Sequence, residues 1–281
     1  MAARSRRRRG AKLLTLASDL GSAYAAQMKA VLHDAVPGAR LVDLTHDLRP
    51  HAVAEAAFVL RPTIARWPAG SVHVVVVDPG VGGRRQPVAV ACADGSAFVG
   101  PDNGVLGPLV DARGGGVAYR IDPQRLRARP RVGTTFDGRD VFAPAAALLA
   151  VGTPASRLGP PTVLAPPRGP LPRRGPRAVV GSVVHIDRFG NVVTDVPTDW
   201  LPDDATALAV RLGSTDRRLP RCRSYEEAGI GRVCVLGSSF GTLEIAVAEG
   251  RAADRLRARL GVRVRFGWRT SRPRSPRRNR K

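Results

Sequence analysis

The chain has 281 residues, of which 43% are hydrophobic, and this is enough for a buried core in one large or two ordinary domains. Its formal net charge of +22 is mostly due to arginine, and much of it lies in two tails, residues 1–12 and 269–281, which contain no acidic residue and are predicted to be disordered. We interpret the tails as solvated ends, with contact to nucleic acid or another polyanion as the alternative, because no nucleic-acid-binding motif accompanies them.

Residues 13–153 are predicted to form an α/β domain with a largely parallel sheet, because predicted strands alternate with predicted helices in this part of the chain. The strands are expected at 13–17, 39–44, 74–77, 88–92 and 97–99, and the helices at 24–33, 53–65, 105–110 and 142–150. The turn at Asp94-Gly95 predicts a hairpin between the last two strands. Pro62 is expected to kink the second helix or to end it early.

Residues 154–177 are rich in proline, which excludes a helix, and they are predicted to form an extended linker. Between residues 178 and 268, short apolar runs alternate with turns and predict a smaller C-terminal β-barrel domain. The three cysteines form no CxxC pair and the histidines show no ligand spacing, so no metal site is predicted. The sequence shows no signal-peptide core and no membrane-spanning run, and we therefore expect a cytoplasmic protein.

The strand that contains four consecutive valines, Val74 to Val77, ends at Asp78 and is followed by Arg85. Such an apolar β-branched run predicts a strand buried on both faces, and the Pro-Gly pair after Asp78 then turns the backbone. Ligands of open α/β sheets bind at the carboxyl ends of the strands, so Asp78 and Arg85 are candidate functional residues. The alternative is an aspartate that only caps a turn.

Three further turns carry carboxylates or amides after predicted strands, namely Ser18 to Gly21, Thr135 to Asp140 and Asp187 to Asn191. Groups held in this way suit a polar ligand with ribose hydroxyls and an ammonium group. The sequence has no Walker loop and no GxGxxG motif, so it does not predict a phosphate site. A GxSxG-like run places Ser239 at its centre, but it lies in the β-rich part rather than between a strand and a helix.

The order and spacing of these turns and of several other motifs resemble the S-adenosylmethionine hydroxide adenosyltransferase family, which is related to the S-adenosylmethionine-dependent fluorinase and chlorinase. The resemblance covers residues from about 13 to 266. The motifs that carry it are Ser18-Asp19-Leu20-Gly21, Leu44-Thr45-His46-Asp47, Val77-Asp78-Pro79-Gly80-Val81-Gly82, the stretch from Ala91 to Asn103-Gly104, Phe136-Asp137-Gly138-Arg139-Asp140 and Ile186-Asp187-Arg188-Phe189-Gly190-Asn191.

This resemblance implies an N-terminal α/β domain, a C-terminal β-barrel, and a homotrimer whose sites lie between the N-domain of one subunit and the C-domain of its neighbour. It also implies hydrolysis of S-adenosyl-L-methionine, in which water or hydroxide attacks the ribose 5′ carbon and adenosine and L-methionine are released. S-adenosyl-L-methionine is then the substrate, and no separate cofactor is expected. Because a sulfonium is already an activated leaving group, the protein chiefly desolvates and aligns the nucleophile.

The same resemblance assigns roles to individual residues. Asp78 and Arg85 match the family's water-polarising aspartate and arginine, and Asp137 stands at its third catalytic position. The implied substrate-binding residues are Asp19 for the ribose hydroxyls, Phe136 for ribose and adenine, Asp187 for the methionine ammonium, Phe189, Asn191 and Tyr225 for adenine, and Ser239 for the methionine carboxylate.

Asp137 is also the main departure from the family pattern, which usually has a histidine there, in a Phe-His-Gly-Arg-Asp run. An aspartate is a weaker base than histidine, and this one adds like charge beside Asp78, so altered activity, a shared-proton carboxylate pair and lost activity are all open. Smaller departures are Ser22-Ala23 after Gly21, and Phe240 in place of a small polar residue.

Two alternative functions stay open, the second of them because of Asp137 and the arginine-rich tails. One is an S-adenosylmethionine-dependent halogenase, although the halogenases lack the aspartate–arginine pair and a carboxylate repels a halide. The other, from a different class, is a non-catalytic protein that binds S-adenosylmethionine or adenosine.

Overall fold

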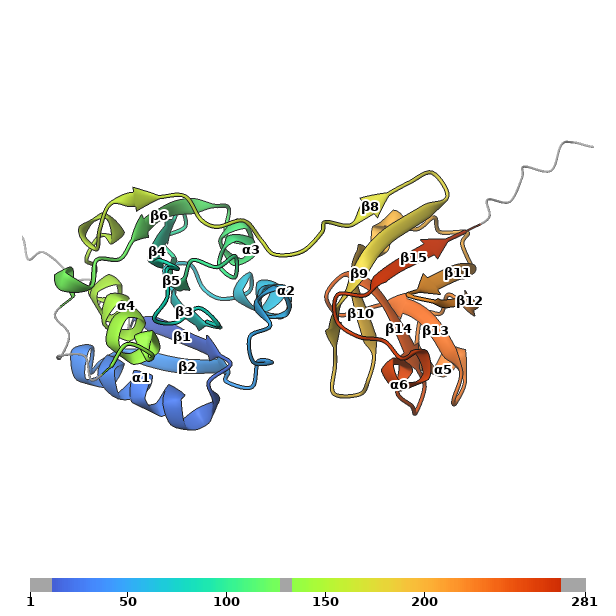
Figure 1. The fold of residues 1–281 in the computed structure, drawn as a ribbon, viewed down its shortest axis with the longest axis horizontal. Coiled ribbons are helices and arrows are strands. Elements are labelled where there is room, and N and C mark those ends of the chain that lie inside the picture. Colours follow the sequence, from blue (N-terminus) through green and yellow to red (C-terminus); the bar gives the residue numbers. More distant parts are fainter. Residues whose placement is uncertain (1–11, 127–132, 269–281) are drawn as a thin grey trace, which may run out of the picture. The chain divides into compact units, whose positions relative to one another are not determined.

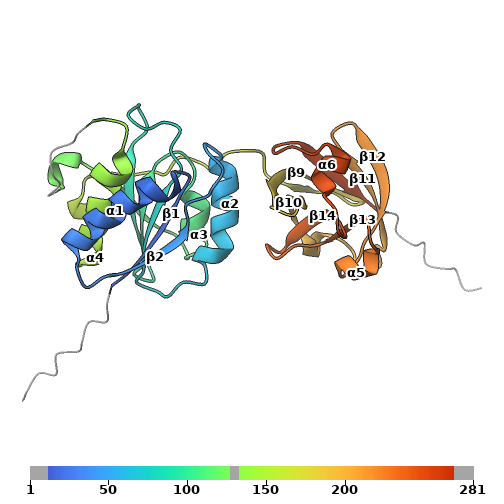
Figure 2. The same ribbon diagram turned by 90° about the horizontal axis from the view of Figure 1, so that it is seen from below.

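The computed structural model describes residues 12–126 and 133–268, and both basic tails, apart from Lys12, lie outside these ranges. The described chain divides into two compact units, and the division falls between Arg168 and Gly169, inside the proline-rich segment (Figures 1 and 2). Each unit has its own sheet and its own hydrophobic core. No helix of the described chain is long and apolar enough to cross a membrane.

The N-terminal unit is built on a seven-stranded mixed sheet with the strand order β2-β1-β3-β5-β4-β6-β7. Its strands are β1 (Leu13–Ser18), β2 (Arg40–Thr45), β3 (Val72–Val76), β4 (Pro87–Cys92), β5 (Ala97–Pro101), β6 (Gly116–Arg120) and β7 (Pro161–Thr162). The neighbouring pairs from β2 to β5 are parallel, and those from β5 to β7 are antiparallel. The sheet is therefore mixed, and the expectation of a largely parallel sheet holds for only one half of it.

The antiparallel half begins at the hairpin predicted around Asp94-Gly95, which the structure confirms between β4 and β5. Because a tight turn rather than a crossover helix connects these strands, β4 runs against the parallel strands. The next strands, β6 and β7, continue the antiparallel pattern. Since β7 lies within residues 154–177, the first part of the proline-rich segment belongs to the N-terminal sheet.

Helices cover both faces of this sheet (Figure 1). They are α1 (Gly21–Ala35) and α4 (Ala143–Ala150) on one face, and α2 (Val53–Ile64) and α3 (Gly107–Asp111) on the other. Strand β3 is buried on both faces, as its valine run predicts, with Val74 in the core under α1 and α4, and Val75 in the core under α2 and α3. Helix α2 passes Pro62 and ends at Ile64. Short helical turns are η1 (Pro123–Arg125), the π-helical η2 (Gly138–Phe142) and η3 (Ala155–Arg157).

The C-terminal unit is an antiparallel sheet curled into a nearly closed barrel, with the order β12-β11-β15-β9-β10-β14-β13 and with β8 paired to β9. Its elements are β8 (Arg173–Arg174), β9 (Ala178–Ile186), β10 (Val192–Pro197), η4 (Thr198–Trp200), β11 (Ala207–Leu212), β12 (Thr215–Pro220), α5 (Tyr225–Ala228), β13 (Val233–Gly237), β14 (Thr242–Val247), α6 (Ala252–Leu256) and β15 (Arg263–Gly267). A bridge between Arg221 and Val235 connects the two ends of the sheet and nearly closes the barrel. This agrees with the predicted smaller β-barrel domain.

Candidate active site

Three polar side chains follow β1, β3 and β5, whose carboxyl ends lie at one edge of the N-terminal sheet because these neighbouring strands are parallel. Asp19 follows β1, Asp78 follows β3, and Asn103 follows β5. The buried amide of Asn103 donates to the Val77 carbonyl over 2.9 Å and so connects the end of β5 to that of β3. This is the edge at which open α/β sheets bind ligands.

Asp78 and Arg85 form a bidentate ion pair across the turn that follows β3. The turn folds back through two backbone hydrogen bonds, from Val81 N–H to the Asp78 carbonyl (3.3 Å) and from Gly83 N–H to the Gly80 carbonyl (3.0 Å). A Cβ atom at Gly80 would lie 3.1 Å from Arg85 Cγ, so glycine leaves room for the arginine side chain. Arg85 Nε donates to Asp78 Oδ1 over 3.0 Å, and Arg85 Nη2 donates to Asp78 Oδ2.

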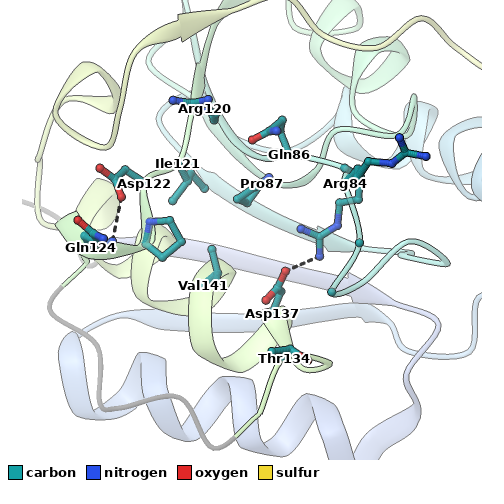
Figure 3. Close-up of a pocket in the computed structure, with 14 residues that line it drawn as sticks. Arg84, Gln86, Pro87, Arg120, Ile121, Asp122, Gln124, Thr134, Asp137 and Val141 are labelled. Carbon is teal, nitrogen blue, oxygen red and sulfur yellow. Dashed lines mark hydrogen bonds and ion pairs between the residues drawn. The ribbon is translucent and has the colours of Figure 1, made fainter.

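The same Nη2 atom of Arg85 donates to Asp137 Oδ2 over 2.5 Å (Figure 3). Asp137 directly precedes the π-helical turn η2, a rare geometry that is frequent at functional sites. The guanidinium carbon lies 5.4 Å from the centre of the Phe142 ring. The side chains of Asp78, Arg85 and Asp137 are only 4%, 10% and 7% exposed, so the three charges interact with little solvent screening.

This cluster contains two carboxylates and one guanidinium, so its formal charge is −1. Burial is the largest influence on the pKa of Arg85 and acts to lower it, but hydrogen bonds and charges from Asp78 and Asp137 outweigh burial and raise the pKa. Arg85 is therefore a permanent cation between two hydrogen-bond acceptors. Such an arrangement is suited to hold a water molecule, and a carboxylate of the cluster is suited to accept a proton from it.

A cavity of about 840 Å³ in the N-terminal unit borders the cluster (Figure 3). Its polar lining includes Arg85 and Asp137, and also Arg84, Arg120 and Asp122. This volume lies within the range of small-molecule sites. The buried cluster is thus next to a space that suits a small ligand.

Asp19 is held by the loop that follows β2. Its carboxylate accepts a hydrogen bond from His51 N–H over 3.0 Å, and His51 has a φ of 65°, which is uncommon for a non-glycine residue. Beside it, Ser18 Oγ and His46 Nδ1 are 2.8 Å apart, and His46 Nε2 lies 3.1 Å from Asp43 Oδ1. These contacts connect the ends of β1 and β2 and fix the position of Asp19.

Phe136 is partly exposed and lies directly before Asp137 in the chain. Its ring meets that of Tyr24 edge-on, with 5.2 Å between the centres, and the Arg139 guanidinium carbon lies 5.0 Å from its centre. Arg139 is in turn paired with Asp140. The structure therefore fixes Phe136 beside the charged cluster through aromatic and cationic neighbours.

In the C-terminal unit, Asp187 organises the turn between β9 and β10. Its Oδ1 atom accepts the backbone N–H groups of Phe189 and Asn191, each over 2.9 Å, and its Oδ2 atom accepts Asn191 Nδ2 over 2.9 Å. Phe189 is 71% exposed, whereas Asn191 is buried. Gly190 adopts a φ of 85°, which glycine permits, and a Cβ atom there would collide with Arg251.

Helix α5 places Tyr225 next to this turn. The Tyr225 hydroxyl donates to Glu244 Oε1 over 2.6 Å and accepts from Asn191 Nδ2 over 3.4 Å. Burial is the main cause that raises the pKa of both Tyr225 and Glu244; the Glu244 carboxylate raises that of Tyr225 further, and the charge of Asp187 raises that of Glu244. Glu244 is not among the predicted site residues, because it lies in the otherwise apolar run of β14, which indicates only a strand.

The structure brings the predicted site residues together in two groups. Asp78, Arg85 and Asp137 are in direct contact in the N-terminal unit, and Asp187, Asn191 and Tyr225 are in direct contact in the C-terminal unit. Asp19 and Phe136 are fixed by other neighbours, and Phe189 and Ser239 are exposed in turns. Among the described residues, no group of three or more potential metal-binding side chains occurs.

Comparison with protein-family models assigns both units to one family. The model for the SAM hydroxide adenosyltransferase N-terminal domain matches residues 14–159, and the model for the C-terminal domain matches residues 181–265. The chain belongs to the SAM hydroxide adenosyltransferase family.

Individual relatives agree with this assignment. The chain is 39% identical over 270 residues to the (R)-S-adenosyl-L-methionine hydrolase of Thermus thermophilus. This alignment covers 89% of the present chain and 97% of the Thermus thermophilus protein. The chain is 37% identical over 251 residues to the (R)-S-adenosyl-L-methionine hydrolase of Salinispora arenicola, with coverage of 88% and 93%. A fluorinase of Nocardia brasiliensis is 26% identical over 295 residues, with coverage of 91% and 97%.

The solved structures include a similar fold. The crystal structure of an uncharacterized conserved protein from Thermotoga maritima matches with a TM-score of 0.82 and 31% sequence identity. The match covers 90% of this chain and 99% of that chain, so both units have counterparts in it.

Proposed function

We propose that this protein is an S-adenosyl-L-methionine hydrolase that forms adenosine and L-methionine. The observation that carries the proposal is the buried cluster of Asp78, Arg85 and Asp137 at the carboxyl edge of the sheet. The similarity to proteins named (R)-S-adenosyl-L-methionine hydrolase, at 39% and 37% identity over most of the chain, supports the same reaction.

In the proposed reaction, a water oxygen forms a bond to the ribose 5′ carbon as the bond from that carbon to sulfur breaks. The electron pair of the broken bond goes to sulfur, which leaves as the neutral thioether of methionine. The water gives up a proton, and Asp78 or Asp137 accepts it, while Arg85 keeps both carboxylates in place. Because the sulfonium needs no acid catalyst, position and desolvation of the water account for most of the rate.

The remaining predicted residues would hold the substrate. We assign Asp19 to the ribose hydroxyls, Asp187 to the methionine ammonium and Ser239 to the methionine carboxylate. The carboxylates of Asp19 and Asp187 are held by backbone N–H groups, which supports fixed acceptors at these positions. The adenine contacts would be Phe189, Asn191 and Tyr225, with Phe136 beside the ribose and adenine.

We further propose a cytoplasmic homotrimer that uses no separate cofactor, with each site completed by the N-terminal unit of one subunit and the C-terminal unit of its neighbour. Light scattering of the purified protein tests the oligomer, since a monomeric mass would contradict it. If both units contribute to one site, mixing an N-unit variant with a C-unit variant restores activity in some sites.

A direct test is to incubate the purified protein with S-adenosyl-L-methionine and to separate the products by chromatography. Steady release of adenosine supports the hydrolase, and a 5′-halo nucleoside formed only when halide is added would indicate a halogenase. Intact bound ligand without turnover would indicate a binding protein. Asp78→Asn should lower kcat by about 10²–10⁴-fold with little change in ligand affinity, and equal loss of binding would count against its role in the chemical step.

A further inference from the structure

Glu244 is a buried carboxylate that the proposed reaction does not use. It lies in β14, where β10 and β13 pair on either side, and only 5% of it is exposed. Burial of a charged group is unfavourable unless hydrogen bonds compensate it. The described partner of Glu244 is the Tyr225 hydroxyl, 2.6 Å away, and within the described residues Glu244 forms no ion pair with an arginine or lysine.

An ionised carboxylate can only accept, so in this form Glu244 makes the Tyr225 hydroxyl donate toward it. The Tyr225 oxygen is then free to act only as an acceptor toward Asn191, whose Nδ2 atom lies 3.4 Å away. Burial and the neighbouring carboxylate raise the pKa of Tyr225, so the hydroxyl keeps the proton that it donates.

The other neighbour of Asn191 is also an acceptor. Asp187 Oδ2 accepts the Asn191 amide nitrogen over 2.9 Å. Both acceptors require the NH₂ group, so the amide cannot rotate by half a turn without placing its oxygen against Asp187 and Tyr225. Asn191 therefore turns its carbonyl oxygen away from both acceptors and presents it as an acceptor of fixed direction.

We propose that Glu244 is a positioning residue that fixes the hydrogen-bond direction from Tyr225 to Asn191 and thereby makes the site select a 6-amino purine over a 6-oxo purine. This inference rests on the proposed function, in which Asn191 contacts the adenine ring. An exocyclic amino group donates to the Asn191 carbonyl oxygen, whereas a 6-oxo group places a second acceptor against it. A site with fixed polar groups discriminates more strongly than an apolar pocket does.

The test compares binding of adenosine and of inosine to the intact protein by calorimetry, in wild type and in Glu244→Gln. The glutamine keeps the volume but can donate to the Tyr225 oxygen, so the chain of hydrogen bonds loses its single direction. We expect the preference for adenosine over inosine to fall by about tenfold. The kcat for S-adenosyl-L-methionine should change by less than about twofold, and its KM should rise. An unchanged nucleoside preference would overturn the proposal.

A second variant keeps the test valid if Glu244→Gln does not fold. Tyr225→Phe removes the hydroxyl and should lower the preference to a similar extent, and the double variant should be no worse than either single one because both act through one contact. Glu226→Gln, an exposed glutamate on the same helix α5 as Tyr225, is the matched control and should leave both nucleoside affinities unchanged.

The outcomes separate this inference from the proposed function. If the wild type hydrolyses S-adenosyl-L-methionine and Glu244→Gln keeps the full nucleoside preference, only the role of Glu244 is wrong. If the wild type releases no adenosine from S-adenosyl-L-methionine but prefers adenosine over inosine, and Glu244→Gln loses that preference, the role of Glu244 stands and the proposed reaction fails.

Discussion

In the N-terminal unit the buried carboxylates Asp78 and Asp137 share one guanidinium, whereas in the C-terminal unit the buried carboxylate Glu244 has a tyrosine hydroxyl as its described partner. A full positive charge offsets one of the two negative charges in the N-terminal cluster. The Glu244 carboxylate instead faces a neutral dipole, at the end of a chain of hydrogen bonds that continues through Asn191 to Asp187.

The difference matches the work that each half would do. A reacting water needs strong, fixed charges that stabilise a developing transition state, and a guanidinium between two carboxylates supplies them. Recognition of a neutral purine needs donors and acceptors of fixed direction, which a buried carboxylate and a hydroxyl can set without a cation. Loss of the cation should therefore cost the N-terminal unit far more than loss of a hydroxyl costs the C-terminal unit.

The largest expected effect follows from removal of the shared cation. In Arg85→Met, the buried carboxylates of Asp78 and Asp137 lose the guanidinium that both contact, and we expect the free energy of unfolding to fall by about 3–5 kcal/mol. Denaturant unfolding followed by circular dichroism measures this. Arg84→Met, which changes the exposed neighbour, should stay close to wild type. If both variants lost the same stability, the cluster would not be the cause.

A compensating variant makes this test sharper. Adding Asp78→Asn and Asp137→Asn to Arg85→Met removes the uncompensated charges, so most of the lost stability should return although activity does not. A triple variant as unstable as Arg85→Met alone would mean that packing of the Arg85 side chain, rather than its charge, holds the cluster together.

The next largest effect is a difference between the two units in how much stability they lose in acid. His73 is fully buried, donates to or accepts from Thr15 Oγ1 over 2.7 Å, and has a pKa lowered from 6.5 to about 4, mainly by burial. The unfolded chain gains a proton on His73 near pH 6.5 and the folded chain only near pH 4. The stability from neutral His73 is therefore present above pH 6.5 and is lost as the pH falls toward 4.

In the C-terminal unit, a fall in pH has the opposite effect on stability. Burial is the main cause that raises the pKa of Glu244 and of Asp195, so acid relieves their buried charge instead of removing a stabilising one. Between about pH 7 and about pH 5 we expect the N-terminal unit to lose about 2 kcal/mol relative to the C-terminal unit. Hydrogen exchange of the intact protein, read by peptides of each unit, measures this. His73→Asn should remove most of the difference, leaving the smaller share that comes from Glu244 and Asp195; an undiminished difference would mean that His73 is not its main origin.

The sequence predicts the local parts of this contrast, but not the contacts between residues that are far apart in the chain. The Asp78 turn is predictable because a β-branched run ends in Asp-Pro-Gly, which is a local signal. The contact of Arg85 with Asp137 is not, since 52 positions separate the two residues and no periodicity relates them; only the resemblance to a family placed them in one site. Likewise, the apolar run around Glu244 indicates a strand but not that its single acid meets Tyr225.

The strand order of the N-terminal sheet is likewise only partly predictable from the sequence. Alternation of strands and helices predicts the parallel half, and Asp94-Gly95 predicts the hairpin. The sequence does not reveal that the hairpin returns on the far side of β5 and that β6 then pairs with β4, because strand order depends on tertiary packing rather than on local pattern. The expectation of a largely parallel sheet was therefore wrong for the half next to the cavity.

A smaller effect tests whether the N-terminal half also uses hydrogen bonds for position. His46 connects Ser18 to Asp43, beside the turn of Asp19. In His46→Leu this connection is lost, and we expect KM for S-adenosyl-L-methionine to rise by about fivefold, or about 1 kcal/mol, with kcat nearly unchanged. Steady-state kinetics measure the split. His33→Leu, at an exposed position of α1, is the matched control, and an equal change there would remove the assigned role of His46.

The smallest expected effect concerns Asp137, the position at which the family usually has histidine. Asp137→His removes one of the two carboxylates on Arg85 but leaves the bidentate pair with Asp78. A histidine accepts a proton near neutral pH, so kcat should be preserved or should rise by up to about threefold. The pH profile of kcat/KM should then gain an acid limb near about pH 6.5 that the wild type lacks. A collapse of activity would mean that the site has been rebuilt around the carboxylate. In that case the reaction would require two acids beside Arg85 at this position, rather than one base that accepts a proton.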